Sequence, residues 1–182
     1  MKSIVQDAQE PLRKAYKETP TLAMVTDHAR TCGAVPADPF HSTVEPMDGC
    51  GVAVPVGVPR AVGGRHDAPT PGDLLCAALA ACQDSAVRMV AKRLGVEILA
   101  LEVRVSAQVD VRGTLGMDAN VPVGFQSMTC EVNLTVADGT PDKLLNSLQI
   151  AAERCCVVQQ TLRHPPTVTT CFRAVGANLG VV

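Results

Sequence analysis

The stretch TPGDLLCAALAACQDSAVRMVAKRLG, residues 70–95, decides the fold. It opens with Thr70 as a helix cap, Pro71 at the first helical position and Asp73 in the first turn, and it ends near Gly95. Its first half is apolar on every side, and in its second half apolar residues recur at three- and four-residue spacings. The sequence therefore predicts one long, buried, central helix between these two ends.

Two alternating segments follow this helix. Residues 101–112 (LEVRVSAQVDVR) have apolar side chains at odd positions, and residues 127–136 (SMTCEVNLTV) have them at even positions. Each pattern predicts a strand with one buried face. The loop between them contains Gly and Pro, which favours antiparallel pairing of the two strands.

A second helical segment begins after Thr140-Pro141-Asp142, which has the pattern of a helix start. The β-branched pair Val157-Val158 is expected to interrupt this helix, and His164-Pro165-Pro166 to end it. Residues 167–172 (TVTTCF) then predict a last short strand.

The first third of the chain has a different pattern. Residues 5–18 predict a short polar helix that stops before Pro20, so residues 1–20 are interpreted as a peripheral helical arm and residues 21–182 as a single domain. Short β-prone runs separated by Pro and Gly predict antiparallel strands at 21–26, 41–45 and 50–56. The expected class is α+β with antiparallel sheets.

Composition excludes several classes of function. The net charge of −2 and the single Tyr, three Phe and absent Trp provide neither a basic face nor a stacking platform, so we expect no nucleic-acid partner. The N-terminus has no long apolar run typical of a signal peptide, and the longest apolar stretch, 74–82, is shorter than a membrane span. We therefore expect a cytoplasmic protein, without membrane segments, whose thiols are reduced.

A chain of this length can bury a core without crosslinks, so its eight cysteines are not needed to stabilise the fold as disulfides. Cys82 lies on the apolar stripe of the first helix, and Cys156 lies beside Arg154 where the second helix is expected to break, so the two thiols could meet. From the residues alone, Cys82 is interpreted as a small core side chain, and Cys156 is a slightly better candidate for chemistry. No CxxC or HxxxH pair and no nucleotide-binding motif is present, so we expect neither a metal nor a cofactor.

Three segments in this order, LLCAALAAC (74–82), VDVRGTLGMDANVPVGFQSM (109–128) and AERCCVVQQTL (152–162), resemble the OsmC/Ohr family. The resemblance covers roughly residues 20–172. It implies an intertwined α+β homodimer, with antiparallel sheets wrapped around two central helices and two active sites at the subunit interface.

The resemblance also implies a reaction. In the peroxidase members of the family, one Cys on the central helix attacks the peroxide and becomes a sulfenic acid, which condenses with a second Cys on the later helix. By motif position Cys82 would be the attacking thiol and Cys156 the resolving one, with Cys155 in a place usually held by another residue. An outside dithiol would then reopen the disulfide.

The chain departs from the family pattern near the reactive thiol. The family's Glu before the central helix corresponds to Gly72, and the neighbouring Asp73 is either its substitute or simply a helix cap. The Pro that commonly follows the resolving Cys is Val157. For the arginine that supports the thiolate in the family, the candidates here are Arg30, Arg65 and Arg154, each of which could equally be a solvated surface charge.

Three functions are consistent with the sequence. The first is a thiol peroxidase of organic or hydrogen peroxides in the oxidative stress response, with an apolar lining from Leu75, Leu79 and Met89 that favours hydrophobic peroxides. The second is a catalytically weak dimer that binds a small hydrophobic ligand. The third is a redox-sensing dimer whose disulfide changes its shape.

Overall fold

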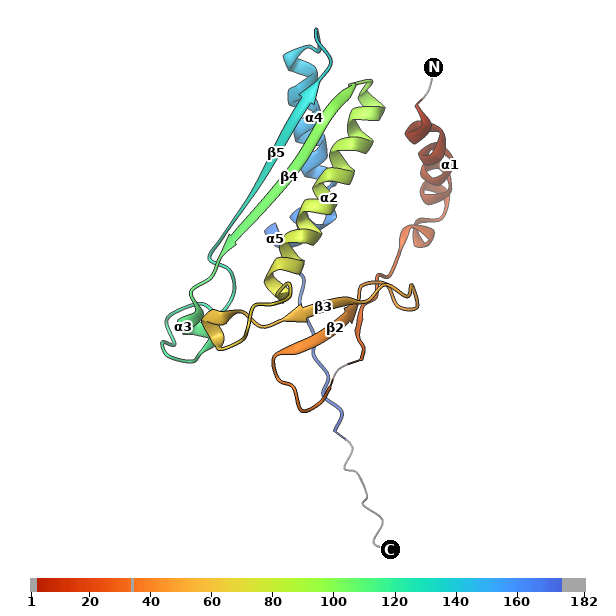
Figure 1. Ribbon diagram of the computed structural model, residues 1–182. Coiled ribbons are helices and arrows are strands. Elements are labelled where there is room, and N and C mark those ends of the chain that lie inside the picture. The colour runs from red at the N-terminus through yellow and green to blue at the C-terminus, as the bar shows by residue number, and fades with distance from the viewer. Residues whose placement is uncertain (1–2, 34, 175–182) are drawn as a thin grey trace, which may run out of the picture.

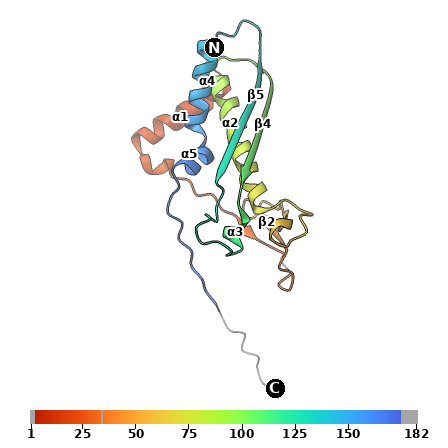
Figure 2. The ribbon, with the colours of Figure 1, turned by 90° about the vertical axis from the view of Figure 1, so that its left-hand side faces the viewer.

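A long helix and a two-stranded sheet form the body of the molecule (Figure 1). The computed structural model describes residues 3–33 and 35–174. Helix α2 (Pro71–Leu94) runs along strands β4 (Ile98–Gln108) and β5 (Ser127–Val136), which pair antiparallel from Ile98 opposite Val136 to Gln108 opposite Ser127. Helices α4 (Asp142–Cys155) and α5 (Val157–Arg163) pack on another side of α2 (Figure 2). The mixed class and the antiparallel sheets predicted from the sequence are confirmed.

The ends of α2 are fixed by the residues that predicted them. The Thr70 backbone N–H donates to Asp73 Oδ2 at 2.8 Å, and the Asp73 N–H donates to Thr70 Oγ1 at 3.2 Å, which closes a capping box. At the other end Gly95 adopts the left-handed conformation, with φ of 76°. The helix therefore presents its side chains in a fixed register to the sheet and to α4.

The hydrophobic core lies where α2 meets α4 and α5. Its fully buried members are mostly small and aliphatic, and Cys156 is among them at 0% exposure. Partly buried side chains from β4 and β5 pack against this cluster, together with Cys82. The buried core comprises Leu79, Ala86, Val87, Val90, Ala91, Val96, Leu148, Ala152 and Cys156.

The N-terminal elements lie away from this sheet. Helix α1 (Ile4–Glu18) contacts α2, and both views place it on the side of α2 opposite to β4 and β5 (Figures 1 and 2). A three-stranded antiparallel sheet lies near the start of α2, in the order β1–β2–β3. The remaining elements are η1 (Pro20–Ala23), β1 (Arg30–Thr31), β2 (His41–Glu45), β3 (Val54–Gly57) and η2 (Arg60–Val62).

Two strand predictions are wrong. The run 21–26 is not a strand, because Pro20 begins the 3₁₀ turn η1 that covers its first residues. The last run, 167–172, has no regular secondary structure in the described part of the chain. Its β-branched residues favour a strand, but within this described chain no neighbouring strand pairs with them.

Several boundaries also differ from the sequence prediction. Strand β3 begins at Val54, not at the start of the predicted run 50–56. Strand β4 ends at Gln108, because the Asp110 carboxylate accepts the backbone N–H of Arg112 at 3.0 Å and caps the short helix α3 (Val111–Thr114). The second helix breaks at Cys156, which has extended φ and ψ of −74° and 102°, and not at the two valines after it. Cys156 therefore lies at the junction of α4 and α5.

Helix α2 is long and apolar enough to cross a membrane by length and composition alone. The core helix of a globular protein meets the same criteria. Because α2 packs against β4, α4 and α5, we interpret it as a core helix.

Candidate functional site

The thiols of Cys82 and Cys156 are in contact. Cys82 lies midway along α2 and is partly buried, and Cys156 lies at the α4–α5 junction, where no part of it is exposed. Cys82 packs against the core cluster that contains Cys156 and is close enough to act on the pKa of the Cys156 thiol, and both are free thiols. The structure thus brings together the two cysteines that the sequence singled out.

The surroundings of Cys156 keep its proton on the sulfur. Burial, together with the interaction with Cys82, raises the pKa of the Cys156 thiol to about 11, although the backbone N–H of Gln159 acts in the opposite direction. The charge of Cys130 adds to the increase. Cys156 is therefore a protonated thiol at neutral pH.

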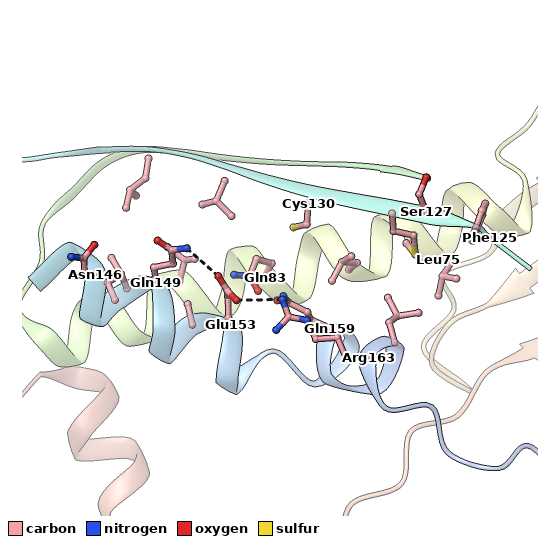
Figure 3. Close-up of a pocket in the computed structure, with 18 of the residues that line it drawn as sticks. Leu75, Gln83, Phe125, Ser127, Cys130, Asn146, Gln149, Glu153, Gln159 and Arg163 are labelled. Carbon is pink, nitrogen blue, oxygen red and sulfur yellow. Dashed lines mark hydrogen bonds and ion pairs between the residues drawn. The ribbon is translucent and has the colours of Figure 1, made fainter. Parts of the chain in front are cut away.

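A groove of about 1020 Å³ opens between the β4–β5 sheet and the helices α2, α4 and α5 (Figure 3). Leu75, Leu79 and Val87 line it from α2, and the inward faces of β5 and α4 complete an apolar wall. Cys130, on β5, faces this groove (Figure 3), and burial raises the pKa of its thiol. The apolar lining expected from Leu75 and Leu79 is present, whereas Met89 lies outside this groove.

Polar side chains gather at one point of the groove. Glu153 accepts a hydrogen bond from Gln149 at 3.2 Å and pairs with Arg163 at 3.4 Å (Figure 3). Gln83 is 4% exposed, and its Oε1 has no hydrogen-bond partner. Sequence analysis missed these residues, because nothing in the spacing of Gln83 or Glu153 distinguishes them from surface positions of a helix.

Gly72 makes room for an aromatic ring. A Cβ built at Gly72 would lie 2.9 Å from Cζ of Phe125, closer than side-chain atoms normally approach. Phe125 therefore occupies the space into which a larger side chain at position 72 would extend. The neighbouring Asp73 serves the capping box, and its hydrogen bonds from Thr70 lower the pKa of its carboxyl group. His66 Nε2 lies 3.9 Å from Asp73 Oδ2, and within the described residues Asp73 pairs with no arginine.

Arg30 is engaged within the three-stranded sheet. Its Nε lies 2.7 Å from Glu45 Oε2 and 2.7 Å from Asp48 Oδ1. The Glu45 carboxylate also accepts the backbone N–H of Gly51 at 3.0 Å, and its pKa is lowered mainly by the hydrogen bond from Arg30. Within this chain, the ion pair between Arg30 and Glu45 therefore links β1 to β2.

The other two arginine candidates are exposed. The Arg65 carbonyl accepts a hydrogen bond from Arg60 Nε at 3.1 Å. The pKa of the nearby Asp67 carboxyl group is lowered mainly by its hydrogen bond with His41, and the charge of Arg65 adds only a small part. Arg154 makes no ion pair with the described residues. No arginine is among the groups that shift the pKa of Cys156. Over residues 3–33 and 35–174, no three His, Cys, Asp or Glu side chains are grouped so that they could hold a metal ion.

The family assignment comes from comparison of the sequence with known families. The family described as OsmC-like protein matches residues 64–170, which is more than half of the chain. The chain belongs to the OsmC-like protein family. The matched range contains Cys82 and Cys156, whereas α1 and the three-stranded sheet precede it.

Solved structures share the OsmC-like fold. An OsmC-like protein from Mycoplasma pneumoniae aligns with a TM-score of 0.60 at 14% identity, over 78% of this chain and 89% of that one. Organic hydroperoxide resistance proteins from Elizabethkingia anophelis and Legionella pneumophila align with TM-scores of 0.56, at 20% and 22% identity, each over 78% of this chain and 91% of the other. No curated protein matches the sequence. At these identities the similarity establishes the fold.

Proposed function

We propose that this OsmC-like chain is a two-cysteine peroxidase that reduces organic or hydrogen peroxides. The observation that carries the proposal is the proximity of the buried Cys156 thiol to Cys82 on α2. Membership of the OsmC-like family and the fold shared with proteins described as organic hydroperoxide resistance proteins support it. The cycle needs no metal or cofactor.

The first step takes place at Cys82. Its thiolate attacks one peroxide oxygen and the O–O bond breaks, which leaves a sulfenic acid on Cys82 and releases an alcohol, or water from hydrogen peroxide, after protonation. The assignment of Cys82 as the attacking thiol and Cys156 as the resolving thiol follows from their positions in the motifs that resemble the OsmC/Ohr family.

The second step joins the two cysteines. The Cys156 sulfur attacks the Cys82 sulfenic acid, water leaves, and a disulfide forms. Because the two side chains already lie close together, little movement of the helices is required. An external dithiol then reduces the disulfide in two exchange steps, becomes a disulfide itself and returns both thiols. In a reducing cytoplasm such a donor is available.

We also propose that the protein is a homodimer. A single chain leaves apolar surface open at the groove of about 1020 Å³, where Leu75 on α2 is 37% exposed and Val132 on β5 is 38% exposed. Ala77, Ala78 and Ala81 on α2 are exposed as well. Burying this surface against a second copy removes it from water, which is the main favourable term in association.

A second function is favoured by the same groove. Its size and apolar walls suit a small hydrophobic ligand, and no arginine of the described chain acts on Cys156. In that case the thiols would be passive core residues.

Peroxide turnover distinguishes the two functions. The purified protein is mixed with cumene hydroperoxide and dithiothreitol, and peroxide consumption is followed for wild type, Cys82→Ser and Cys50→Ser, whose changed residue is exposed and outside the site. Activity in wild type and Cys50→Ser, with complete loss in Cys82→Ser, supports the peroxidase. Equal consumption by wild type and Cys82→Ser would refute it and favour the ligand-binding function.

A further inference from the structure

A second cavity lies on the opposite side of α2 from the β4–β5 sheet. It is a slot of about 290 Å³ between α1 and α2, with Cys155 at the end of α4 also lining it. This volume is close to the lower end of the ~300–1000 Å³ range of ligand pockets. The α1 wall lies before residue 64, outside the segment matched to the family.

Each helix presents one face to the slot. The lining residues recur on both helices with the spacing i, i+3, i+4 and i+7, which places them on a single stripe of each helix. They are Gln9, Leu12, Arg13 and Tyr16 on α1, and Ala86, Met89, Val90 and Arg93 on α2. The slot is therefore a regular feature of the packing of two helices.

The walls of the slot are apolar and incompletely covered. Ala86 and Val90 are buried at its base, whereas Leu12 is 48% exposed and Met89 is 44% exposed. An alkyl group between Leu12 and Met89 would remove both side chains from water, at about 25 cal/mol for each Å² buried.

The charges around the slot all have one sign. Arg13 and Arg93 line it, no acidic residue does, and neither arginine forms an ion pair with a carboxylate of the described residues. The buried Oε1 of Gln9 has no hydrogen-bond partner among the residues that the structure describes. An amide can be turned to present its NH₂ group instead, so Gln9 can add a donor to those of the two guanidinium groups.

We propose that this slot binds an alkyl carboxylate, a monomeric fatty acid, with its carboxylate between the two arginines and its chain along the apolar wall of α2. Guanidinium groups bind carboxylates through paired N–H donors, and the apolar stripe accepts the chain. The ligand does not react, and no thiol takes part. The site is therefore independent of the proposed peroxidase activity.

Calorimetric titration of the full-length reduced protein with sodium decanoate, below its micelle-forming concentration, tests this site. Wild type should bind about one decanoate per chain. Arg13→Ala/Arg93→Ala should bind about tenfold more weakly or worse, because charge-assisted hydrogen bonds are lost. Lys14→Ala/Lys92→Ala removes the same charge from the same helices but outside the slot, and should bind like wild type. Leu12→Asp, which places a carboxylate in the slot, should abolish binding while the thermal melting curve is retained.

Several outcomes would overturn the proposal. These are no saturable decanoate binding by wild type, equal losses in the arginine and lysine double variants, or equal affinity for decyltrimethylammonium, which has the same chain and the opposite charge. Sedimentation with phosphatidylglycerol vesicles without binding of free decanoate would identify a lipid surface instead. Cys82→Ser should bind decanoate normally, so failure of the peroxidase proposal would leave this result unchanged.

Discussion

Cys156 lies beside Cys82 at a position with no exposed surface. The neighbouring Cys155, by contrast, is exposed. Two adjacent cysteines thus differ completely in environment, because the helix breaks between them and directs one thiol into the core and the other outward.

This difference predicts the pH dependence of alkylation. Cys156 in the reduced, folded protein should resist iodoacetamide at neutral pH and react only as the pH approaches its raised pKa of about 11, because the thiolate is the reactive form. Cys155 in the same peptide is the control and should be alkylated faster, because it is exposed. Mass mapping of the alkylated peptide measures both. Alkylation of Cys156 at neutral pH as fast as that of Cys155 would contradict a buried thiol with a raised pKa.

The same raised pKa affects stability. The Cys156 thiol has an ordinary value of 9.0, so an unfolded chain loses this proton first as the pH rises. The contribution of Cys156 is fully present below pH 9 and is lost as the pH rises to about 11. Urea unfolding of wild type and Cys156→Ser at several pH values between 9 and about 11 measures this contribution. The free energy of unfolding of wild type should fall relative to that of Cys156→Ser over this range, and the same pH dependence in both proteins would contradict the prediction.

A histidine in the three-stranded sheet makes a second prediction. His41 Nδ1 lies 2.8 Å from Asp38 and Nε2 lies 2.9 Å from Asp67, so both ring nitrogens need a proton. Hydrogen bonds to the two carboxylates raise the pKa of His41. Its stabilising effect is present below the ordinary histidine pKa and is lost as the pH rises through the raised value. The melting temperature of wild type should therefore fall over this range relative to that of His41→Gln.

The control for His41 is His28→Gln, at an exposed position. This variant should keep the pH dependence of wild type. If His41→Gln also keeps the pH dependence of the wild-type melting temperature, the two carboxylates do not hold a charged imidazole in solution.

Position 72 gives a prediction about packing. Gly72→Glu should destabilise the protein by about 1–3 kcal/mol, because the added Cβ lies 2.9 Å from the Phe125 ring. Phe125→Leu should relieve most of this loss, so the double variant should be more stable than the sum of the two single changes predicts. Denaturant unfolding of the four proteins measures the coupling. Additive effects would show that Phe125 does not fill the space at position 72.

The helices and the main sheet could be predicted from the sequence. The Thr70–Asp73 capping box and Gly95 mark both ends of α2, and strict alternation marks β4 and β5. These signals depend only on residues close together in the sequence, so they can be recognised without knowing the tertiary contacts. The run 167–172 shows the limit, because a strand needs a partner as well as β-branched residues, and none lies beside it in the described chain.

The site was predictable only in part. The position of Cys82 on the apolar stripe and the break near Cys156 indicated that the thiols could meet, and they do. The supporting carboxylate and arginine could not be assigned in the same way. Arg30 pairs with Glu45 through strand pairing, and Phe125 reaches Gly72 across more than fifty residues of sequence, so neither contact has a local signal.

The most direct test of the central claim is a peptide map after one equivalent of cumene hydroperoxide is added to the fully reduced protein. The account predicts one major disulfide, between Cys82 and Cys156, together with a dimedone-trapped sulfenic acid on Cys82 when Cys156 is replaced by Ser. An oxidised product in which Cys82 and Cys156 both remain free thiols, or in which disulfides form only among exposed cysteines such as Cys50 and Cys155, would contradict it.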